Sequence, residues 1–535
     1  MSKRVYMDHS ATTPVRCEVV EAMLPFFQEK FGNASSVHSF GQEAHTAMEN
    51  SREKVASLLG AAPEEIIFTS GGTESDNTAV TGAAHANQKK GKHVITSAIE
   101  HPAVLNTCKI LEKRGFEVTC LPVDGEGLVD PDDLRRALRP DTTLVSIMLA
   151  NNEVGVIEPV AELAALAHKE PDKVPVDFGS TWITTITIPA YERLKHHFGI
   201  DSPTVTMERA QQVCMVDERI LQAFHADTRG VFYGLPDMER NRFVELGENV
   251  YRDSWGITWH KPPSSFYFDM LKPALGGEIT LNDVMTHQWP DPHDPGYTRG
   301  LRERVTKQRG ATDCALVLNL SIWVLQCGQF VRGFEDWFVD LIRQPRLMEA
   351  ILDAITESLQ GVVEDVLDEV GDLVDVVSVS DDMGHQDRTC VRPELYRKII
   401  KPRHARLMAA IKSRTKAPVM WHTCGSVYDL LDDLVEIGMD ALNPVQTDAA
   451  KMEPERLKRD YGDRLTFWGG IDTARVLPFG TPKDVEGEVR KKIRIFAPGG
   501  GFILNSVHNI QPNVPLENIF ALFESAQKFG KYPIG

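Results

Sequence analysis

Short apolar runs alternate with amphipathic stretches along the first third of the chain. The runs are rich in β-branched residues, which is typical of buried strands, and stretches with apolar residues three or four positions apart separate them. We expect a helix over residues 41–59 and strands at 65–69, 93–96, 117–121 and 143–149. This alternation indicates an α/β sheet.

The pattern changes near residue 170 and becomes a longer series of strand-like and helical stretches. We expect helices over 428–437 and 482–495, and strands at 176–178, 374–379, 418–421, 440–442, 465–468 and 502–504. Regular strand and helix alternation of this length predicts a (β/α)₈ barrel of the TIM type, whose active site gathers at the carboxyl ends of the strands. The chain therefore divides into a first segment, 1–168, and a complete barrel, 169–535.

Composition narrows the classes of function. With 535 residues, 42% of them hydrophobic, the chain is too long for one ordinary core. Its formal net charge of -18 repels phosphate backbones and anionic lipids, which argues against nucleic acid or a membrane as partner. The eight cysteines are scattered and the N-terminus lacks the apolar segment of a signal peptide. We therefore expect free thiols, a cytoplasmic location and a small-molecule substrate.

Polar side chains follow the predicted barrel strands, at the point where each strand ends. Because these ends open on one face of a barrel, we expect the groups to face one mouth. They are Asp381, Asp382 and Gln386, then His422 and Cys424, then Asn443 and Gln446, then Asp472, and finally His508. The candidate catalytic groups among them are Asp381, Asp382, Gln386 and Asp472. Asp381 and Asp382 fit an acid–base pair or orienters of an imidazole, and a role as surface or capping carboxylates is an equal alternative.

The pair His422 and Cys424 is the strongest chemical signal in the barrel. An imidazole and a thiolate two residues apart, at the end of an apolar run, are suited to holding one borderline metal ion such as zinc. The alternative is that the imidazole forms ordinary hydrogen bonds in a pocket and the cysteine is a buried thiol. Both interpretations stay open at this point.

The first segment resembles the N-terminal part of the cysteine desulfurases, pyridoxal-phosphate enzymes of fold type I. Matching motifs occur in order at 6–14, 31–38, 68–77, 100–104 and 151–155. The resemblance implies that Thr73 and the glycines before it bind the cofactor phosphate, that His101 stacks on the pyridine and that Asn152 hydrogen-bonds the phenolic oxygen. It predicts a truncated fold type I α/β sheet segment.

The resemblance stops before the segments that carry the chemistry of that family. Nothing matches the aspartate that pairs with the pyridine nitrogen, the lysine of the Schiff base or the cysteine that takes the sulfur. Lys169 is a poor substitute, because it follows Asn152 far too closely. We expect a vestigial site without covalently bound pyridoxal phosphate. The open edge of so short a sheet predicts a homodimer, docking on the second domain or low stability, so the segment would serve as a scaffold.

From about residue 171 the chain resembles the uroporphyrinogen decarboxylase superfamily, which includes cobalamin-linked methyltransferases. The matching stretches are 170–179, 392–402, 422–427, 467–472, 477–482, 499–508 and 515–518. In the methyltransferase branch, zinc is held by a His-x-Cys pair and a second cysteine near the end of the last strand. Here His508 takes the place of that cysteine. The resemblance implies a zinc site of His422, Cys424 and His508, and methyl transfer involving a corrinoid protein or a thiol acceptor.

The decarboxylase branch is the main alternative, because it also has a histidine at the place of His508. Its enzymes use no cofactor and bind the carboxylates of a tetrapyrrole with an N-terminal arginine pair, but residues 176–184 contain no arginine. Zinc-assisted methyl transfer is therefore the predicted activity, and a carboxy-lyase of tetrapyrrole metabolism is the second choice. Two neighbouring genes joined into one chain would also account for the two resemblances.

Overall fold

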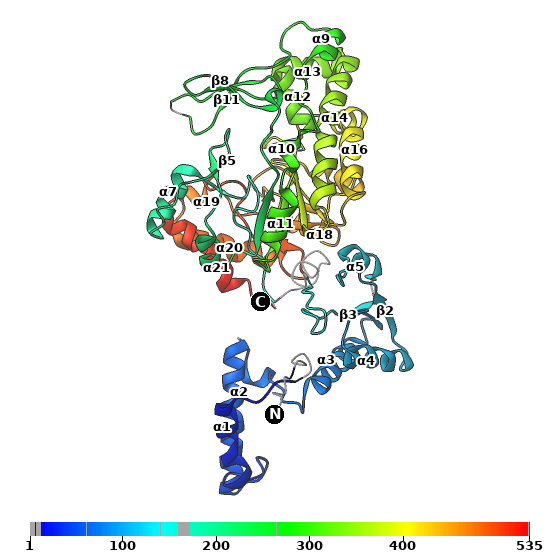
Figure 1. Ribbon diagram of the computed structural model, residues 1–535, viewed down its shortest axis with the longest axis vertical. Helices are drawn as coiled ribbons and strands as arrows, with labels where there is room; N and C mark the ends of the chain where they lie inside the picture. The colour runs from blue at the N-terminus through cyan, green and yellow to red at the C-terminus, as the bar shows by residue number, and fades with distance from the viewer. Residues whose placement is uncertain are drawn as a thin grey trace, which may run out of the picture. The chain divides into compact units, whose positions relative to one another are not determined.

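The computed structural model describes residues 6, 12–59, 61–139, 141–158, 172–263, 265–320, 322–532 and 534. Lys169 and most of the motif at 6–14 lie outside these residues. The chain forms two compact units, Met1–Glu158 and Pro159–Gly535, which we describe separately as the N-terminal unit and the barrel unit (Figure 1).

The N-terminal unit contains a three-stranded parallel sheet in the order β2-β1-β3. Its strands are β1 (His93–Ser97), β2 (Glu117–Leu121) and β3 (Thr142–Ser146), which confirms three of the four predicted strands. The helices are α1 (Cys17–Gln28), α2 (Ser39–Leu59), η1 (Pro63–Glu65), α3 (Gly72–Asn87), α4 (Pro102–Lys113) and α5 (Pro131–Ala137). The predicted strand at 65–69 is wrong. A strand needs a neighbour to satisfy its backbone groups, and this stretch pairs with no strand of the sheet, leaving Ile67 73% exposed.

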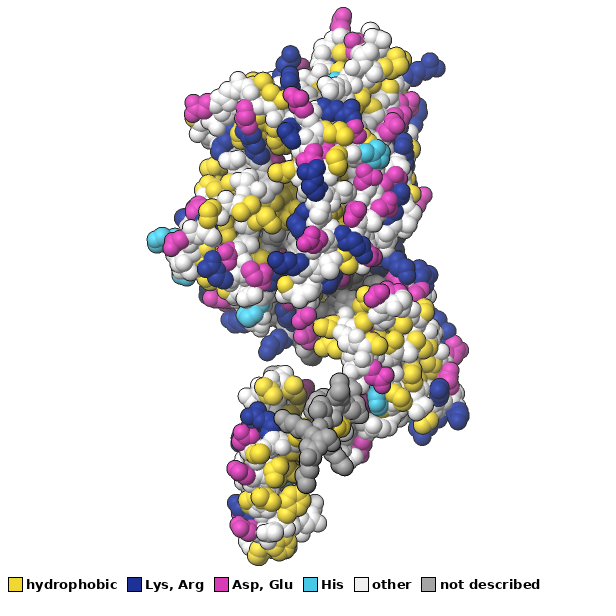
Figure 2. Space-filling model, in the orientation of Figure 1, with side chains coloured by type: hydrophobic (Ala, Val, Ile, Leu, Met, Phe, Trp, Pro, Cys, Tyr) yellow, Lys and Arg dark blue, Asp and Glu magenta, His cyan; other side chains and the backbone are white. Residues whose placement is uncertain are grey.

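The core of the N-terminal unit is small. One cluster of buried side chains lies between α3, α4 and the sheet: Val80, Ala84, Val94, Val104, Cys108, Leu111 and Phe116. Helix α1 buries none of its residues, although its sequence is largely apolar. Leu24 is 54% exposed and Phe27 is 69% exposed, and Figure 2 shows apolar side chains along the surface of α1 and α2. The unit therefore keeps apolar area in water that a folded core would cover.

The barrel unit is built on a seven-stranded parallel sheet in the order β17-β16-β15-β14-β13-β12-β7. Its strands are β7 (Thr228–Phe232), β12 (Ala315–Asn319), β13 (Val376–Ser380), β14 (Val419–His422), β15 (Ala441–Asn443), β16 (Thr466–Trp468) and β17 (Phe502–Ile503). Five of these overlap the strands predicted between residues 374 and 504. Strands β12 to β17 each place one side chain in a shared interior cluster. Its members are Val317, Val376, Met420, Ala441, Trp468 and Ile503.

The segment around Val176 closes this sheet into a barrel. Val176 forms a parallel bridge with Leu504, directly after β17, and its carbonyl accepts a hydrogen bond from the backbone N–H of Asp227, directly before β7. The segment predicted as a strand at 176–178 therefore lies between the two edges of the sheet as the eighth member of the ring. Eight parallel members with helices between them form a (β/α)₈ barrel, as predicted.

Helices cover the outside of the barrel (Figure 1). Helix α20 shows why: Thr481 and Asp484 form a capping box at its start, and its buried residues recur at helical spacing. The helices are α7 (Ile188–His197), α8 (Glu218–Ala223), η2 (Glu239–Asn241), α9 (Leu281–Thr286), α10 (Pro295–Thr298), α11 (Leu301–Arg309), α12 (Val324–Arg332), α13 (Phe334–Arg343), α14 (Pro345–Val370), α15 (Pro393–Leu395), η3 (Tyr396–Ile400), α16 (Lys401–Lys412), η4 (Tyr428–Leu430), α17 (Leu431–Glu436), α18 (Pro454–Tyr461), α19 (Val476–Phe479), α20 (Pro482–Phe496) and α21 (Leu516–Phe529).

Two small sheets are inserted early in the barrel unit. One has the order β4-β6-β5, with β4 (Ile186–Thr187), β5 (Thr206–Glu208) and β6 (Val213–Cys214). The other is antiparallel and consists of β8 (Val244–Gly247), β9 (Val250–Arg252), β10 (Thr258–His260) and β11 (Asp269–Lys272). Within the described parts of the chain, no helix combines the length and the apolar character that crossing a bilayer requires.

Candidate metal centre

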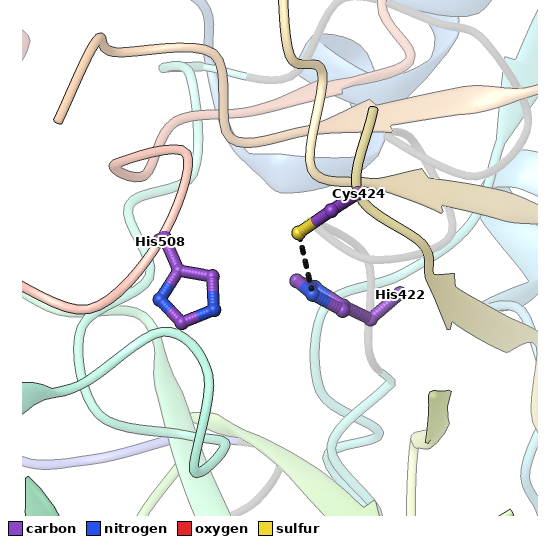
Figure 3. Close-up of side chains that lie close together, drawn as sticks. All are labelled: His422, Cys424 and His508. Carbon is purple, nitrogen blue, oxygen red and sulfur yellow. Dashed lines mark hydrogen bonds between the residues drawn. The ribbon is translucent and has the colours of Figure 1, made fainter. Parts of the chain in front are cut away.

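Three side chains that are far apart in the sequence meet at the carboxyl ends of the barrel strands. His422 ends β14, Cys424 follows it by two residues, and His508 lies in the loop after β17 (Figure 3). Their ligand atoms all lie within 4.8 Å of one another, and Nε2 of His422 is 3.3 Å from Sγ of Cys424. The three predicted metal ligands are therefore neighbours in the fold.

The ring of His422 is held from behind by Asn443. Nδ1 of His422 lies 2.6 Å from Oδ1 of Asn443, and Nδ2 of Asn443 donates a hydrogen bond to the carbonyl oxygen of Trp468 at 3.1 Å. His422 is only 2% exposed and Asn443 is fully buried. The edge of the ring that carries Nε2 thus faces Cys424 and His508.

Asp382 borders the same cluster. Its Oδ1 accepts a hydrogen bond of 2.8 Å from the backbone N–H of Cys424 and lies 3.7 Å from Nε2 of His422. Its side chain keeps about a third of its surface exposed, at 33%. Of the four predicted catalytic residues, Asp382 is the one that touches the cluster.

Burial shifts the proton equilibria of all three clustered side chains toward their neutral forms. It lowers the pKa of His508 to about 4, helped by the neighbouring His422, and it lowers the pKa of His422 against the opposing charge of Asp382. Burial and the carboxylate of Asp382 raise the pKa of the Cys424 thiol well above its ordinary value. Two imidazoles and a thiol, all favoured in their neutral forms, therefore face one another beside the carboxylate of Asp382.

This donor set fits a zinc ion. Zinc takes imidazole nitrogen at about 2.0–2.1 Å and thiolate sulfur at about 2.3 Å in tetrahedral geometry, which separates neighbouring ligand atoms by roughly 3.5 Å. The 3.3 Å between Nε2 of His422 and Sγ of Cys424 matches that spacing, and the 4.8 Å limit for the set requires only a small approach of His508. Three protein ligands leave a fourth position for a substrate or water.

Asp381 is used differently from its neighbour Asp382. Its carboxylate is fully buried and accepts hydrogen bonds from the backbone N–H groups of Leu325 and Gln326, in the first turn of α12, at 2.6 and 2.9 Å. The same carboxylate lies 2.9 Å from Nε2 of His404. Burial raises the pKa of Asp381, and His404 opposes that shift. These contacts support the capping alternative for Asp381, because both of its carboxylate oxygens accept hydrogen bonds from the first turn of α12.

Gln386 and Asp472 lie outside the cluster of metal-type ligands. Gln386 donates to the carbonyl oxygen of Asp448 at 2.8 Å and accepts from Gln446 at 3.0 Å. Oε1 of Gln446 in turn accepts from the backbone N–H of Gly425. Asp472 accepts from the backbone N–H groups at 474 and 475, before α19. Gln386 therefore stabilises the loop after Cys424 through Gln446, and Asp472 stabilises a turn.

The predicted cofactor residues of the N-terminal unit are all exposed. Thr73 lies in the first turn of α3, Asn152 lies in the turn after β3, and His101 caps α4 by accepting a hydrogen bond on Nδ1 from the backbone N–H of Ala103. The glycine before Thr73 has open space where a side chain would stand. These exposed residues do not enclose a pyridoxal phosphate.

One buried carboxylate of the barrel was missed by sequence reasoning. Asp177, in the segment that closes the ring, is 1% exposed and accepts hydrogen bonds from Thr228 at 2.6 Å, from the indole of Trp468 at 2.9 Å and from Asn505 at 3.0 Å. An aspartate between two apolar residues of a predicted strand, Val176 and Phe178, was the available signal. It joins the first strand of the barrel to the last two.

Two family models match the chain, in two different stretches. Residues 5–185 match "Aminotransferase class-V", and residues 322–529 match "Uroporphyrinogen decarboxylase (URO-D)". Each stretch is therefore similar to a different family. The aminotransferase match implies a pyridoxal-phosphate fold for the N-terminal unit, and the second match covers the barrel from α12 to α21, including all three clustered ligands. The first match runs past Val176, which the structure pairs within the barrel.

Individual relatives agree with this division. The chain is 62% identical over 169 residues to the cysteine desulfurase IscS of Dictyoglomus turgidum, covering 32% of this chain and 43% of that protein. It is 60% identical over 168 residues to the cysteine desulfurase IscS of Methanosarcina thermophila, covering 31% and 42%. The chain thus spans less than half the length of these curated relatives.

Two solved structures are similar to different parts of the chain. A methyltransferase from Methanosarcina mazei is 16% identical, covers 69% of this chain and 98% of its own, and has a TM-score of 0.49. A NifS-like protein is 48% identical, covers 30% of this chain and 44% of its own, and has a TM-score of 0.30.

Proposed function

We propose that the barrel unit is a zinc-dependent methyltransferase that moves a methyl group between a corrinoid protein and a thiol. The observation that carries the proposal is the meeting of His422, Cys424 and His508 at the mouth of a uroporphyrinogen decarboxylase-type barrel. A zinc ion bound there would lower the pKa of a thiol in the fourth position and so supply a thiolate at neutral pH. The His-x-Cys pair is the feature shared with the methyltransferase branch of that superfamily.

The residues around the cluster would bind and orient the acceptor. Asp382 is partly exposed and lies beside both His422 and Cys424, so its carboxylate is suited to taking the proton of an incoming thiol. The thiolate then forms the new sulfur–carbon bond, and the methyl carrier leaves with the electrons of the broken bond.

Demethylation of methylcobalamin tests the proposed activity. Methylcobalamin, standing in for the corrinoid protein, is incubated with a small thiol and the zinc-loaded chain, and its loss is followed by absorbance. We expect thiol-dependent loss that falls by more than about 100-fold in Cys424→Ser. Cys314→Ser is the matched control, because Cys314 lies before β12 at the opposite end of the barrel. Equal rates in the two variants would contradict the proposal.

A carboxy-lyase is the second candidate, favoured by the uroporphyrinogen decarboxylase match itself. Against it, the buried segment 176–184 offers no guanidinium group for the carboxylates of a tetrapyrrole. Release of carbon dioxide from uroporphyrinogen by the metal-free chain, unchanged in Cys424→Ser, would favour this candidate over methyl transfer.

For the N-terminal unit we propose a role in assembly, as a homodimer contact. The apolar residues of α1 are exposed, with Phe26 at 43% and Phe27 at 69%, and their burial against a second copy would remove apolar area from water. Light scattering of the full chain tests this. We expect a dimer that dissociates in the double variant Phe26→Glu, Phe27→Glu, whereas a dimer of unchanged strength in that variant would contradict the role.

A further inference from the structure

Asn443 is the residue behind the candidate metal centre. It ends β15, directly opposite His422 in the register of β14 and β15, and its backbone carbonyl accepts a hydrogen bond from the N–H of Thr423 at 2.7 Å. Its side chain is fully buried and touches the only ring nitrogen of His422 that points away from Cys424. The pairing of the two strands therefore fixes the distance between the amide and the imidazole.

The hydrogen bonds of Asn443 determine which way its amide points. The carbonyl oxygen of Trp468 can only accept, so the atom of Asn443 that faces it at 3.1 Å is the donating Nδ2. Oδ1 is then the atom that faces Nδ1 of His422 at 2.6 Å. An amide oxygen can only accept, so Nδ1 of His422 carries the proton.

The position of that proton decides what the other ring nitrogen can do. In a neutral imidazole with a proton on Nδ1, Nε2 has a free lone pair. Nε2 lies 3.3 Å from Sγ of Cys424, on the side of the ring that faces the cluster. For His508, by contrast, no hydrogen bond to its ring is found among the described residues. Among the described residues, a hydrogen bond therefore fixes the ring orientation of His422 but not that of His508.

We propose that Asn443 is a positioning residue that holds His422 in the tautomer with the proton on Nδ1, so that Nε2 is ready to bind zinc. The proposal rests on the metal centre of the proposed function. It adds Asn443 as the residue that orients His422 in the metal-free protein. Without the acceptor, the ring of His422 can carry its proton on Nε2 or rotate. The proton must then move, or the ring must rotate back, before Nε2 can bind zinc. Partners of this kind change metal affinity by about 10–100-fold.

Zinc affinity in two variants tests the proposal. Asn443→Leu removes the acceptor at similar size, and Asn443→Asp keeps an acceptor oxygen toward Nδ1. Competition between the full chain and a chromogenic chelator for zinc alone should show binding weakened by about 10–100-fold in Asn443→Leu and within about threefold of the wild type in Asn443→Asp. Asn319→Leu is the matched control: Asn319 is a buried amide at the end of β12 that donates to backbone carbonyls. Wild-type affinity in Asn443→Leu, with folding confirmed by circular dichroism, would overturn the proposal.

A second measurement does not depend on zinc or on the stability of a variant. Nitrogen-15 spectra of histidine-labelled, metal-free wild type, assigned with His422→Gln, report the tautomer of His422 directly. We expect the proton on Nδ1, and a proton on Nε2 would overturn the inference even if zinc binds. Conversely, a chain that binds no zinc but shows the Nδ1 tautomer would contradict the proposed function and leave the positioning by Asn443 supported.

Discussion

In both units polar side chains follow parallel strands, but the barrel unit brings its predicted metal ligands together, whereas the N-terminal unit leaves its predicted cofactor residues exposed. In the barrel, His422 is 2% exposed and lies beside Cys424 and His508. In the N-terminal unit, His101 and Asn152 follow β1 and β3 and are both exposed. The N-terminal unit nevertheless matches a curated relative at 62% identity. Motif residues make a site only where the surrounding fold buries and orients them.

The physical reason lies in how each sheet is completed. The barrel closes on itself through Val176, so every strand end borders the same enclosed mouth. Among its described residues, the N-terminal sheet has three strands and one small core cluster, and the predicted cofactor residues that follow its strands are exposed.

The N-terminal unit should form no aldimine with pyridoxal phosphate. The exposed Thr73, His101 and Asn152 do not enclose the cofactor, and a Schiff base needs a lysine held beside it. After incubation with the cofactor and desalting, we expect the absorbance of the chain to match that of a sample without cofactor. A stoichiometric label, or sulfide released from cysteine, would show a working site and remove the contrast between the units.

Asp381→Ala should destabilise the barrel strongly, whereas Asp382→Asn should not. The first change leaves two N–H groups of α12 and the buried His404 without their partner, and breaking such a buried network costs about 3–5 kcal/mol. The second changes a partly exposed carboxylate and should cost less than about 1 kcal/mol. Urea unfolding measures both values. Equal losses in the two variants would argue against the division of roles between these neighbours.

The stability of the barrel unit should depend weakly on pH because of Asp253. Burial raises the pKa of Asp253 to about 6, although the indole of Trp259 and backbone N–H groups donate hydrogen bonds to it. Because this pKa lies above the ordinary value, the carboxyl stabilises the fold at low pH, and that contribution is lost as the pH rises through about 6.

Between about pH 5 and pH 7 the loss from Asp253 amounts to about 1 kcal/mol. The free energy of unfolding of the wild type should therefore fall by about that amount relative to Asp253→Asn over this range. A constant difference between the two proteins, measured by urea unfolding at each pH, would mean that Asp253 does not titrate there.

Much of the barrel and its cluster could be predicted from the sequence because both depend on local patterns. Apolar runs mark β13 to β17, and the spacing of His422 and Cys424 is visible without a structure. The sequence left the capping role of Asp381 as one of several alternatives, because its partners in α12 lie more than fifty positions away and no local pattern marks them. The wrongly predicted strand at 65–69 also depends on distant residues: its composition is strand-like, but none of the described strands pairs with it.

The central claim is that the barrel unit holds one zinc ion through His422, Cys424 and His508. Metal analysis of the purified wild type beside Cys424→Ser and the control Cys314→Ser tests it most directly. We predict about one zinc per chain in the wild type and in Cys314→Ser, and less than about a tenth of that in Cys424→Ser. Zinc that is absent from all three proteins after supplementation, or retained in full by Cys424→Ser, would contradict the claim.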